Sequence, residues 1–455
     1  MTPNLPITLS FLAALIRHCL NSYFPKTERD EIGFEEPPTA QTYSNPMPPI
    51  PTLEDDAHPF TRLVLDKNMT VDEYVVLSVS LVHHLQPDFF DSIISEFIQE
   101  KQDFLPLGGV KTSNIRSLQP TAETALFLLA GQDLERRIKV MSLFDQDHFF
   151  AKERILMLEE MRPGEPESAG RLILDPEWVD RILYQKVKKP RFNSNFPAEL
   201  IETKMDWTDL VLPGSTLEEV QELLIWLKHG QSLLEDTRMG KRLKPGYRAL
   251  FWGPPGTGKT LTAALLGKGT NRDVYKIDLS LLVSKYIGET EKNLSNLFDK
   301  AEDKNWILFF DEADALFGKR TNVKDAHDKY ANQEVSYLLQ RVENFNGLVI
   351  LASNFKSNID DAFVRRFQSI IHFPMPKPAE RLRLWEQSIP LNFVKKETID
   401  FQGIAQKYEL SGASILNVVQ YACLKMVGKE KMELSENFLR EGIIREFGKE
   451  GKVVQ

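Results

Sequence analysis

Two runs of the sequence carry side chains that could act on a phosphorylated ligand. The first is GPPGTGKT, residues 253–260, which follows a strand-like run and opens a helical one. Its glycines would let backbone N–H groups wrap a triphosphate, Lys259 would reach the outer phosphates, and Thr260 could ligate magnesium. The residues predicted to contact the nucleotide here are Gly253, Pro254, Pro255, Gly256, Thr257, Gly258, Lys259, Thr260 and Leu261.

The second run, WILFFDEADALF, places two adjacent carboxylates at the end of an apolar, strand-like segment. Asp311 suits the role of magnesium ligand beside a phosphate loop, and Glu312 that of the general base that polarises the attacking water. Asp314 is interpreted as structural. Asn354, at the end of LASN, is predicted to orient the same water.

Two arginines, Arg365 and Arg366, come shortly before the last strand-like run. Such a pair could be ordinary surface charge. With a phosphate loop and an acidic strand end in the same chain, we interpret them as fingers that reach the γ-phosphate bound by a neighbouring subunit and stabilise the transition state.

The elements that would position these residues follow an alternating pattern. Five apolar, strand-like runs alternate with helical segments, at residues 248–252, 274–278, 306–310, 348–352 and 369–373. Near-continuous apolar strands separated by helices predict a parallel sheet that is covered on both faces. After Pro374 the pattern becomes helical, which predicts a small all-helical domain.

In this order, GPPGTGKT, FFDEAD, LASN and RRF resemble the AAA clade of the AAA+ ATPases, over residues 205–447. RRF resembles the arginine-finger motif of members such as spastin and katanin. LSGASILNVVQYA resembles the small-domain motif, in which Gly412 and Ala413 would approach the nucleotide. The family usually has an aspartate where Ser414 stands. WTDLVLP lies where the family cradles adenine with its backbone, which implicates Leu210, Val211 and Leu212.

The resemblance also accounts for SKYIGETEKNL, in which an apolar pair is followed at once by glycine and glutamate. AAA proteins carry a substrate-gripping pore loop at this place, and Lys285, Tyr286, Ile287 and Gly288 would form it. The alternative is that Tyr286 packs within its own subunit. A second polar loop, residues 318–334, could line the channel below, with His327 as a pore-lining or structural residue.

Composition limits the classes of function. The chain has 455 residues, 42% hydrophobic and 27% charged, with a net charge of −9. This acidic balance argues against a general affinity for nucleic acid or anionic membranes. Two cysteines far apart suit a reducing, cytoplasmic setting. The apolar residues 7–16 lack the flanks of a signal peptide and are too few to span a bilayer, so they predict a packed helix.

The N-terminal half carries weaker signals. Residues 37–51 are rich in proline and predict a linker, while residues 70–85 predict a helix with Thr70 as its N-cap. A strand-like RLIL precedes Asp175, and the mixture around it is compatible with a winged-helix-like domain. The predicted organisation is an N-terminal helix and linker (1–51), a mainly helical region (52–192), a large AAA+ domain with a five-stranded parallel sheet (205–375) and a small helical domain (376–447).

The leading hypothesis is a hexameric ATPase, with ATP and Mg²⁺ as cofactors, that remodels or unfolds a protein drawn through a central pore. Its partners would be further copies of itself, in an ATP-promoted homohexamer, and a protein substrate or adaptor bound by the N-terminal region. One alternative is an ATP-driven loader or motor on nucleic acid, which the basic run KVKKPR favours. Another is a nucleotide-switched assembly factor of a contractile injection-type machine, which rests on analogy.

Overall fold

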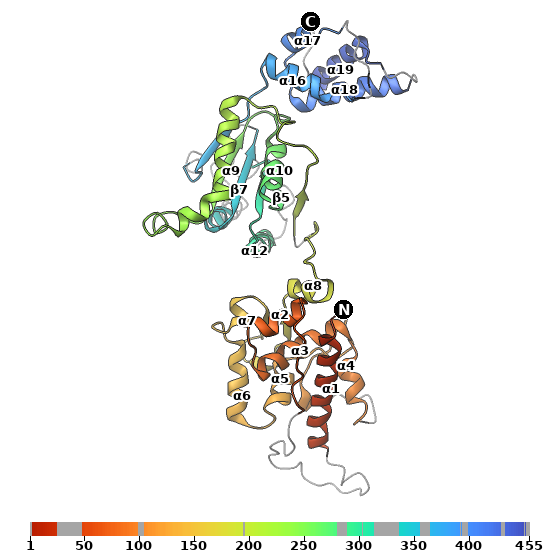
Figure 1. Cartoon of the computed structure of the whole chain (residues 1–455), viewed down its shortest axis with the longest axis vertical. Coiled ribbons are helices and arrows are strands. Elements are labelled where there is room, and N and C mark those ends of the chain that lie inside the picture. The colour runs from red at the N-terminus through yellow and green to blue at the C-terminus, as the bar shows by residue number, and fades with distance from the viewer. Residues whose placement is uncertain are drawn as a thin grey trace, which may run out of the picture. The chain divides into compact units, whose positions relative to one another are not determined.

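The computed structural model describes residues 2–24, 48–98, 104–193, 196–279, 289–302, 304–313, 336–354, 365–391, 393, 399–428, 433–449 and 451. The chain folds into two compact units, Met1–Lys189 and Pro190–Gln455. Each unit has hydrophobic clusters of its own. Figure 1 shows the elements of both units.

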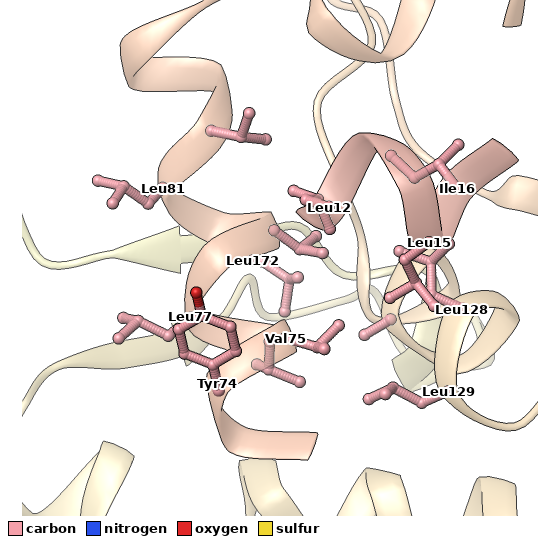
Figure 2. Packing of buried hydrophobic residues seen from close by; sticks show 14 of the residues in the cluster. Leu12, Leu15, Ile16, Tyr74, Val75, Leu77, Leu81, Leu128, Leu129 and Leu172 are labelled. Atoms are coloured by element: carbon pink, nitrogen blue, oxygen red, sulfur yellow. The ribbon is translucent and has the colours of Figure 1, made fainter. Parts of the chain in front are cut away.

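The first unit is mainly helical. Its elements are α1 (Asn4–Tyr23), α2 (Pro59–Asp66), α3 (Val71–Leu85), α4 (Phe89–Ile94), α5 (Ala122–Leu129), α6 (Leu134–Met141), α7 (Phe149–Lys152), β1 (Leu156–Leu158), β2 (Leu172–Leu174) and α8 (Pro176–Tyr184). The predicted N-cap of α3 is present, because Thr70 and Glu73 form a capping box. Figure 2 shows side chains of α1, α3 and α5 gathered with Leu172 of β2 in one core.

Helix α1 belongs to this core and is not a segment apart from the mainly helical region that follows. Leu12 and Ile16 are fully buried, and Asn4 Nδ2 donates a hydrogen bond to Thr61 Oγ1 at 2.8 Å. The helix extends the apolar run predicted at residues 7–16 by three residues before it and seven after it, to 20 residues. By length and composition alone, α1 is also long and apolar enough to cross a membrane.

The strand-like RLIL forms β2, which pairs antiparallel with β1. Both strands have three residues, so helices dominate the described part of this unit, as expected for residues 52–192. The comparison with a winged-helix domain stays a hypothesis.

The second unit is built on a six-stranded sheet in the order β3-β5-β6-β7-β4-β8. Its strands are β3 (Ala198–Ile201), β4 (Tyr247–Trp252), β5 (Val274–Asp278), β6 (Ile307–Asp311), β7 (Leu348–Ser353) and β8 (Ser369–His372). The five predicted strands are present and pair in parallel. The prediction of a five-stranded sheet is nevertheless one strand short, because β3 pairs antiparallel with β5. A four-residue edge strand carries too short an apolar pattern to be recognised.

Helices cover both faces of the sheet. One face packs against α9 (Gly214–Glu235) and α10 (Lys259–Thr270), which lie side by side (Figure 1). The other face packs against α12 (Glu289–Ala301) and the helical residues 336–344. With both faces buried, the central strands need apolar side chains at nearly every position. This is why they could be recognised in the sequence.

The helices after the sheet form a core of their own, as the sequence predicts. They are α16 (Pro378–Ser388), α17 (Phe401–Lys407), α18 (Gly412–Val427) and α19 (Glu436–Lys449). Trp385 is fully buried among them. Arg381 is also buried and donates hydrogen bonds to Ala405 O at 2.7 Å and Pro376 O at 2.5 Å. These bonds fix the start of α16 beside the end of α17.

Candidate active site

The phosphate-loop sequence lies between the end of β4 and the start of α10. Gly256 and Gly258 have φ angles of +76° and +101°, a backbone region that glycine adopts at little cost. A Cβ on Gly256 would lie 2.6 Å from Ser411 Oγ, so only a glycine fits there without displacing its neighbour. A glycine loop that leads into a helix N-terminus presents backbone N–H groups and the positive end of the helix dipole to an anion.

Lys259 is buried at the start of α10. Its Nζ donates hydrogen bonds to Gly253 O at 2.6 Å and Pro254 O at 3.0 Å, and a longer one to Asn354 Oδ1 at 3.3 Å. The structure thus brings Lys259 and Asn354 together at the ends of two paired strands, β4 and β7. A cation held there can exchange these oxygens for the oxygens of a phosphate group.

Asp311 and Glu312 lie at the end of β6. The φ angle of Glu312 is +51°, in the left-handed region that costs a non-glycine residue about 1–2 kcal/mol. Two hydrogen bonds hold this turn: Glu312 N donates to Asp311 Oδ1 at 3.0 Å, and Ala313 N donates to Ala352 O at 2.9 Å. Backbone strain of this kind gathers at functional sites, and no residue pattern in the sequence predicts it.

A cavity of about 580 Å³ collects most of the predicted site, and its size suits a nucleotide. The predicted residues that line it are Leu210, Val211, Leu212, Pro255, Gly256, Thr257, Gly258, Lys259, Thr260, Leu261, Asp311, Glu312, Asn354, Gly412 and Ala413. Gly253 and Pro254 are not among the lining residues. Their carbonyl groups accept the hydrogen bonds of Lys259 instead.

The sequence missed the wall of the cavity that α16 contributes. Helix α16 contributes the lining residues Glu380, Leu384, Gln387 and Ser388. The other lining residues outside the predicted set are Met205, Asp209, Pro213, Pro374, Pro376 and Leu416. A hydrogen bond from Gln387 Nε2 to Thr208 O, at 3.0 Å, ties α16 to the segment expected to hold the base. One signal could have found this wall. The prolines after β8 prevent the strand from continuing, and Pro378 suits the first turn of a new helix, which therefore begins near the carboxyl end of the sheet.

Comparison with known proteins identifies this part of the chain. A model of the AAA family, "ATPase family associated with various cellular activities", matches residues 249–375. Vacuolar protein sorting-associated protein 4B of Pongo abelii is 35% identical over 197 residues, which are 42% of this chain and 44% of that protein. The second unit contains an AAA ATPase domain. Its mostly parallel sheet and covering helices agree with the AAA+ fold that the sequence resemblance predicts, and the matching family is one of ATPases.

Two further proteins are similar to parts of this chain. The proteasome-activating nucleotidase of Pyrococcus abyssi (strain GE5 / Orsay) is 29% identical over 308 residues, 65% of this chain and 74% of that protein. The crystal structure of the FIGL-1 AAA domain aligns at 20% identity over 54% of this chain and 84% of that chain, with a TM-score of 0.43. The chain spans about half the length of most of the curated relatives that it matches.

The small-domain motif of the AAA domain forms the start of α18. Ser411 is its N-cap and accepts a hydrogen bond from Ser414 N at 3.2 Å. Ala413 N donates to Gly256 O at 3.3 Å, which joins α18 to the phosphate loop. Ser414 stands where the family usually has aspartate. Its Oγ lies 3.1 Å from Ser411 Oγ, and the residue does not line the cavity. Ser414 therefore acts within the helix cap.

The two arginines lie apart from the cavity of their own AAA domain. Arg365 and Arg366 are both exposed, and neither belongs to the described residues that line the cavity. Arg366 Nη1 lies 3.0 Å from Glu343 Oε1, at the end of the helical residues 336–344. This ion pair within the chain involves Arg366 and not Arg365, a difference between the two arginines that the sequence does not reveal.

The predicted pore loop, Lys285, Tyr286, Ile287 and Gly288, lies outside the described residues, as do Asp314 and the second loop with His327. Their assignments stay predictions from the sequence.

The donor set fits Mg²⁺ bound together with a nucleotide. Within the described ranges, no group of three or more histidine, cysteine, aspartate or glutamate residues could hold a metal ion by itself. Mg²⁺ in nucleotide sites needs only one or two protein ligands, because phosphate oxygens and waters complete its octahedron. Thr260 and Asp311 line the same cavity and can be those ligands.

Proposed function

We propose that this protein is an ATP-driven machine that remodels or unfolds a protein substrate, assembled as a homohexamer in which each active site lies between two subunits. The proposal is supported by the AAA domain and by the proteins that resemble it. Their names refer to vacuolar protein sorting in one case and to proteasome activation in the other. The N-terminal unit would bind the substrate or an adaptor.

One observation carries the oligomeric part of the proposal. The cavity contains the phosphate loop, both carboxylates and Asn354, yet neither Arg365 nor Arg366 lines it. Hydrolysis of the γ-phosphate of a bound nucleotide needs a cation that stabilises the charge of the transition state. A second copy of the chain would supply that cation from its own exposed arginines.

Within the site, each residue would have one task. Backbone N–H groups of the phosphate loop and Lys259 would bind the phosphates, while Leu210 and Leu212 would hold the base. Thr260 and Asp311 would hold Mg²⁺, whose charge offsets that of the phosphates when it is bound. Glu312 would accept a proton from the attacking water, and Asn354 would orient that water.

Glu312→Gln tests the assignment of the general base. The amide cannot accept the proton, so hydrolysis should fall by a factor of about 10²–10⁴ while ATP still binds. Glu222→Gln, an exposed substitution on α9, is the matched control and should hydrolyse ATP as the wild type does. A Glu312→Gln protein with wild-type turnover would show that another group is the base.

Mixing two inactive proteins tests whether the arginines act between subunits. Subunits with both Arg365→Ala and Arg366→Ala keep Glu312, and Glu312→Gln subunits keep both arginines. A mixed assembly should therefore regain hydrolysis at boundaries that combine the intact parts. No recovery in a mixture shown to co-assemble, or full turnover by dilute monomers, would reject the shared site.

Tyr286→Ala tests the pore. If Tyr286 grips a substrate, the variant should hydrolyse ATP and melt normally but fail to remodel a protein captured by the Glu312→Gln trap. If Tyr286 packs inside its own subunit instead, truncation should cost about 3–5 kcal/mol of stability. A melting temperature many degrees lower, with loss of ATPase activity, would contradict the pore assignment.

A further inference from the structure

A lysine faces the proposed magnesium ligand from the neighbouring strand. β5 and β6 pair in parallel, with Lys276 opposite Phe309 and Asp278 opposite Asp311. Since alternate residues of a strand point to the same face, Lys276 and Asp311 share one face of the sheet. This is the face of the sheet that α10 covers, because Phe309 belongs to the same hydrophobic cluster as residues of α10. A lysine on that face is an unusual choice and needs an explanation.

The two side chains form an ion pair. Lys276 Nζ lies 2.8 Å from Asp311 Oδ2, and the side chains are 34% and 26% exposed. The other carboxylate oxygen, Oδ1, accepts the backbone hydrogen bond of Glu312 at 3.0 Å. Both oxygens of Asp311 are thus engaged within the chain. Asp311 lines the nucleotide cavity and Lys276 does not, so Lys276 can act on a ligand there only through Asp311.

This pair opposes the binding of a divalent cation. A cation at Asp311 is repelled by the ammonium group beside it, and the carboxylate must give up part of its pairing with Lys276 to become a metal ligand. Without a cation the effect reverses, because Lys276 offsets a negative charge that would repel the phosphates. We infer that Lys276 is a positioning residue that sets how strongly nucleotide binding depends on Mg²⁺. The inference rests on the proposed ATP site.

The ion pair between Lys276 and Asp311 contributes little to the stability of the fold. Partly exposed ion pairs contribute about 0.2–1 kcal/mol to folding, so the loss of this pair should change the melting temperature little. The dependence of nucleotide binding on Mg²⁺ is the readout that distinguishes charge competition from a merely structural role.

The experiment measures the dissociation constant of a fluorescent, non-hydrolysable ATP analogue on the full chain, in chelator and in saturating Mg²⁺. The ratio of the two constants is the metal coupling. In Lys276→Met the analogue should bind more weakly without metal and reach half-saturation at lower Mg²⁺. The coupling should rise about fivefold, equivalent to about 1 kcal/mol. Lys276→Gln carries the same prediction if the methionine variant does not fold.

Three controls make the result specific. Lys276→Arg keeps the charge and should keep the wild-type coupling. Lys449→Met removes another lysine–carboxylate pair of the same unit, with Glu446, and should change nothing. In an Asp311→Asn background, the additional substitution Lys276→Met should have no effect on the coupling.

Two results would overturn the inference. One is a folded Lys276→Met or Lys276→Gln protein whose coupling stays within twofold of the wild type. The other is an effect of equal size in the Asp311→Asn background, because Lys276 would then not act through Asp311. Failure of the wild type to bind the analogue at any Mg²⁺ concentration would instead overturn the proposed ATP site itself.

Discussion

The close approach of Gly256 to the start of α18 makes Gly256→Ala a quantitative test of the site. The new Cβ would lie 2.6 Å from Ser411 Oγ and 2.8 Å from Ala413 Cβ. It would also force alanine into the left-handed backbone region, at φ +76°, which costs about 1–2 kcal/mol. Overpacking typically adds about 1–3 kcal/mol. We expect a total of about 2–5 kcal/mol, near the lower end if the serine side chain rotates away.

The cost should appear in two measurements. A thermal melt should show a loss of stability, and nucleotide affinity should fall because α18, which carries Gly412 and Ala413 into the cavity, is pushed away from the loop. Gly164→Ala is the matched control, since its φ is +95° and a Cβ there meets nothing within 4 Å. It should show the backbone cost alone, with unchanged nucleotide affinity. Wild-type melting and affinity in Gly256→Ala would refute the contact between the phosphate loop and α18.

Two other predictions follow from side-chain contacts. Arg365→Ala and Arg366→Ala should each suppress hydrolysis, by up to about 10³–10⁵ for a full arginine finger, without weakening nucleotide binding. Only Arg366→Ala should also lower the melting temperature slightly, since it breaks the pair with Glu343, and equal melts would contradict that difference. Burial lowers the pKa of His83 to about 4 from an ordinary 6.5. Between these two pH values, the folded chain therefore binds fewer protons than the unfolded chain. Stability should therefore fall as the pH drops from 6.5 toward 4, by at most about 1.4 kcal/mol per unit, and His83→Gln should flatten this slope in pH-dependent melts.

The sequence predicts the central strands and the phosphate loop because both depend on local patterns. Strands buried on both faces must be apolar throughout, and a phosphate loop needs glycines, a lysine and a hydroxyl at fixed spacing. The edge strand β3 cannot be predicted in this way, because its four residues are too few to show a strand pattern. It forms a strand by pairing with β5. The wall that α16 adds to the cavity depends on where distant segments meet, and a one-dimensional pattern does not contain that information.

The end of β6 shows why residue types alone do not specify this site. In a regular strand, adjacent side chains point to opposite faces of the sheet, so Asp311 and Glu312 could not serve one ligand. Both line the same cavity, because the strand ends at Asp311 and the chain turns through a left-handed residue at 312. Glycine would adopt that turn at less cost, but glycine has no carboxylate. The strain at Glu312 is thus the cost of placing the proposed magnesium ligand and the proposed general base side by side, and the hydrogen bond from Ala313 N to Ala352 O helps to hold this turn.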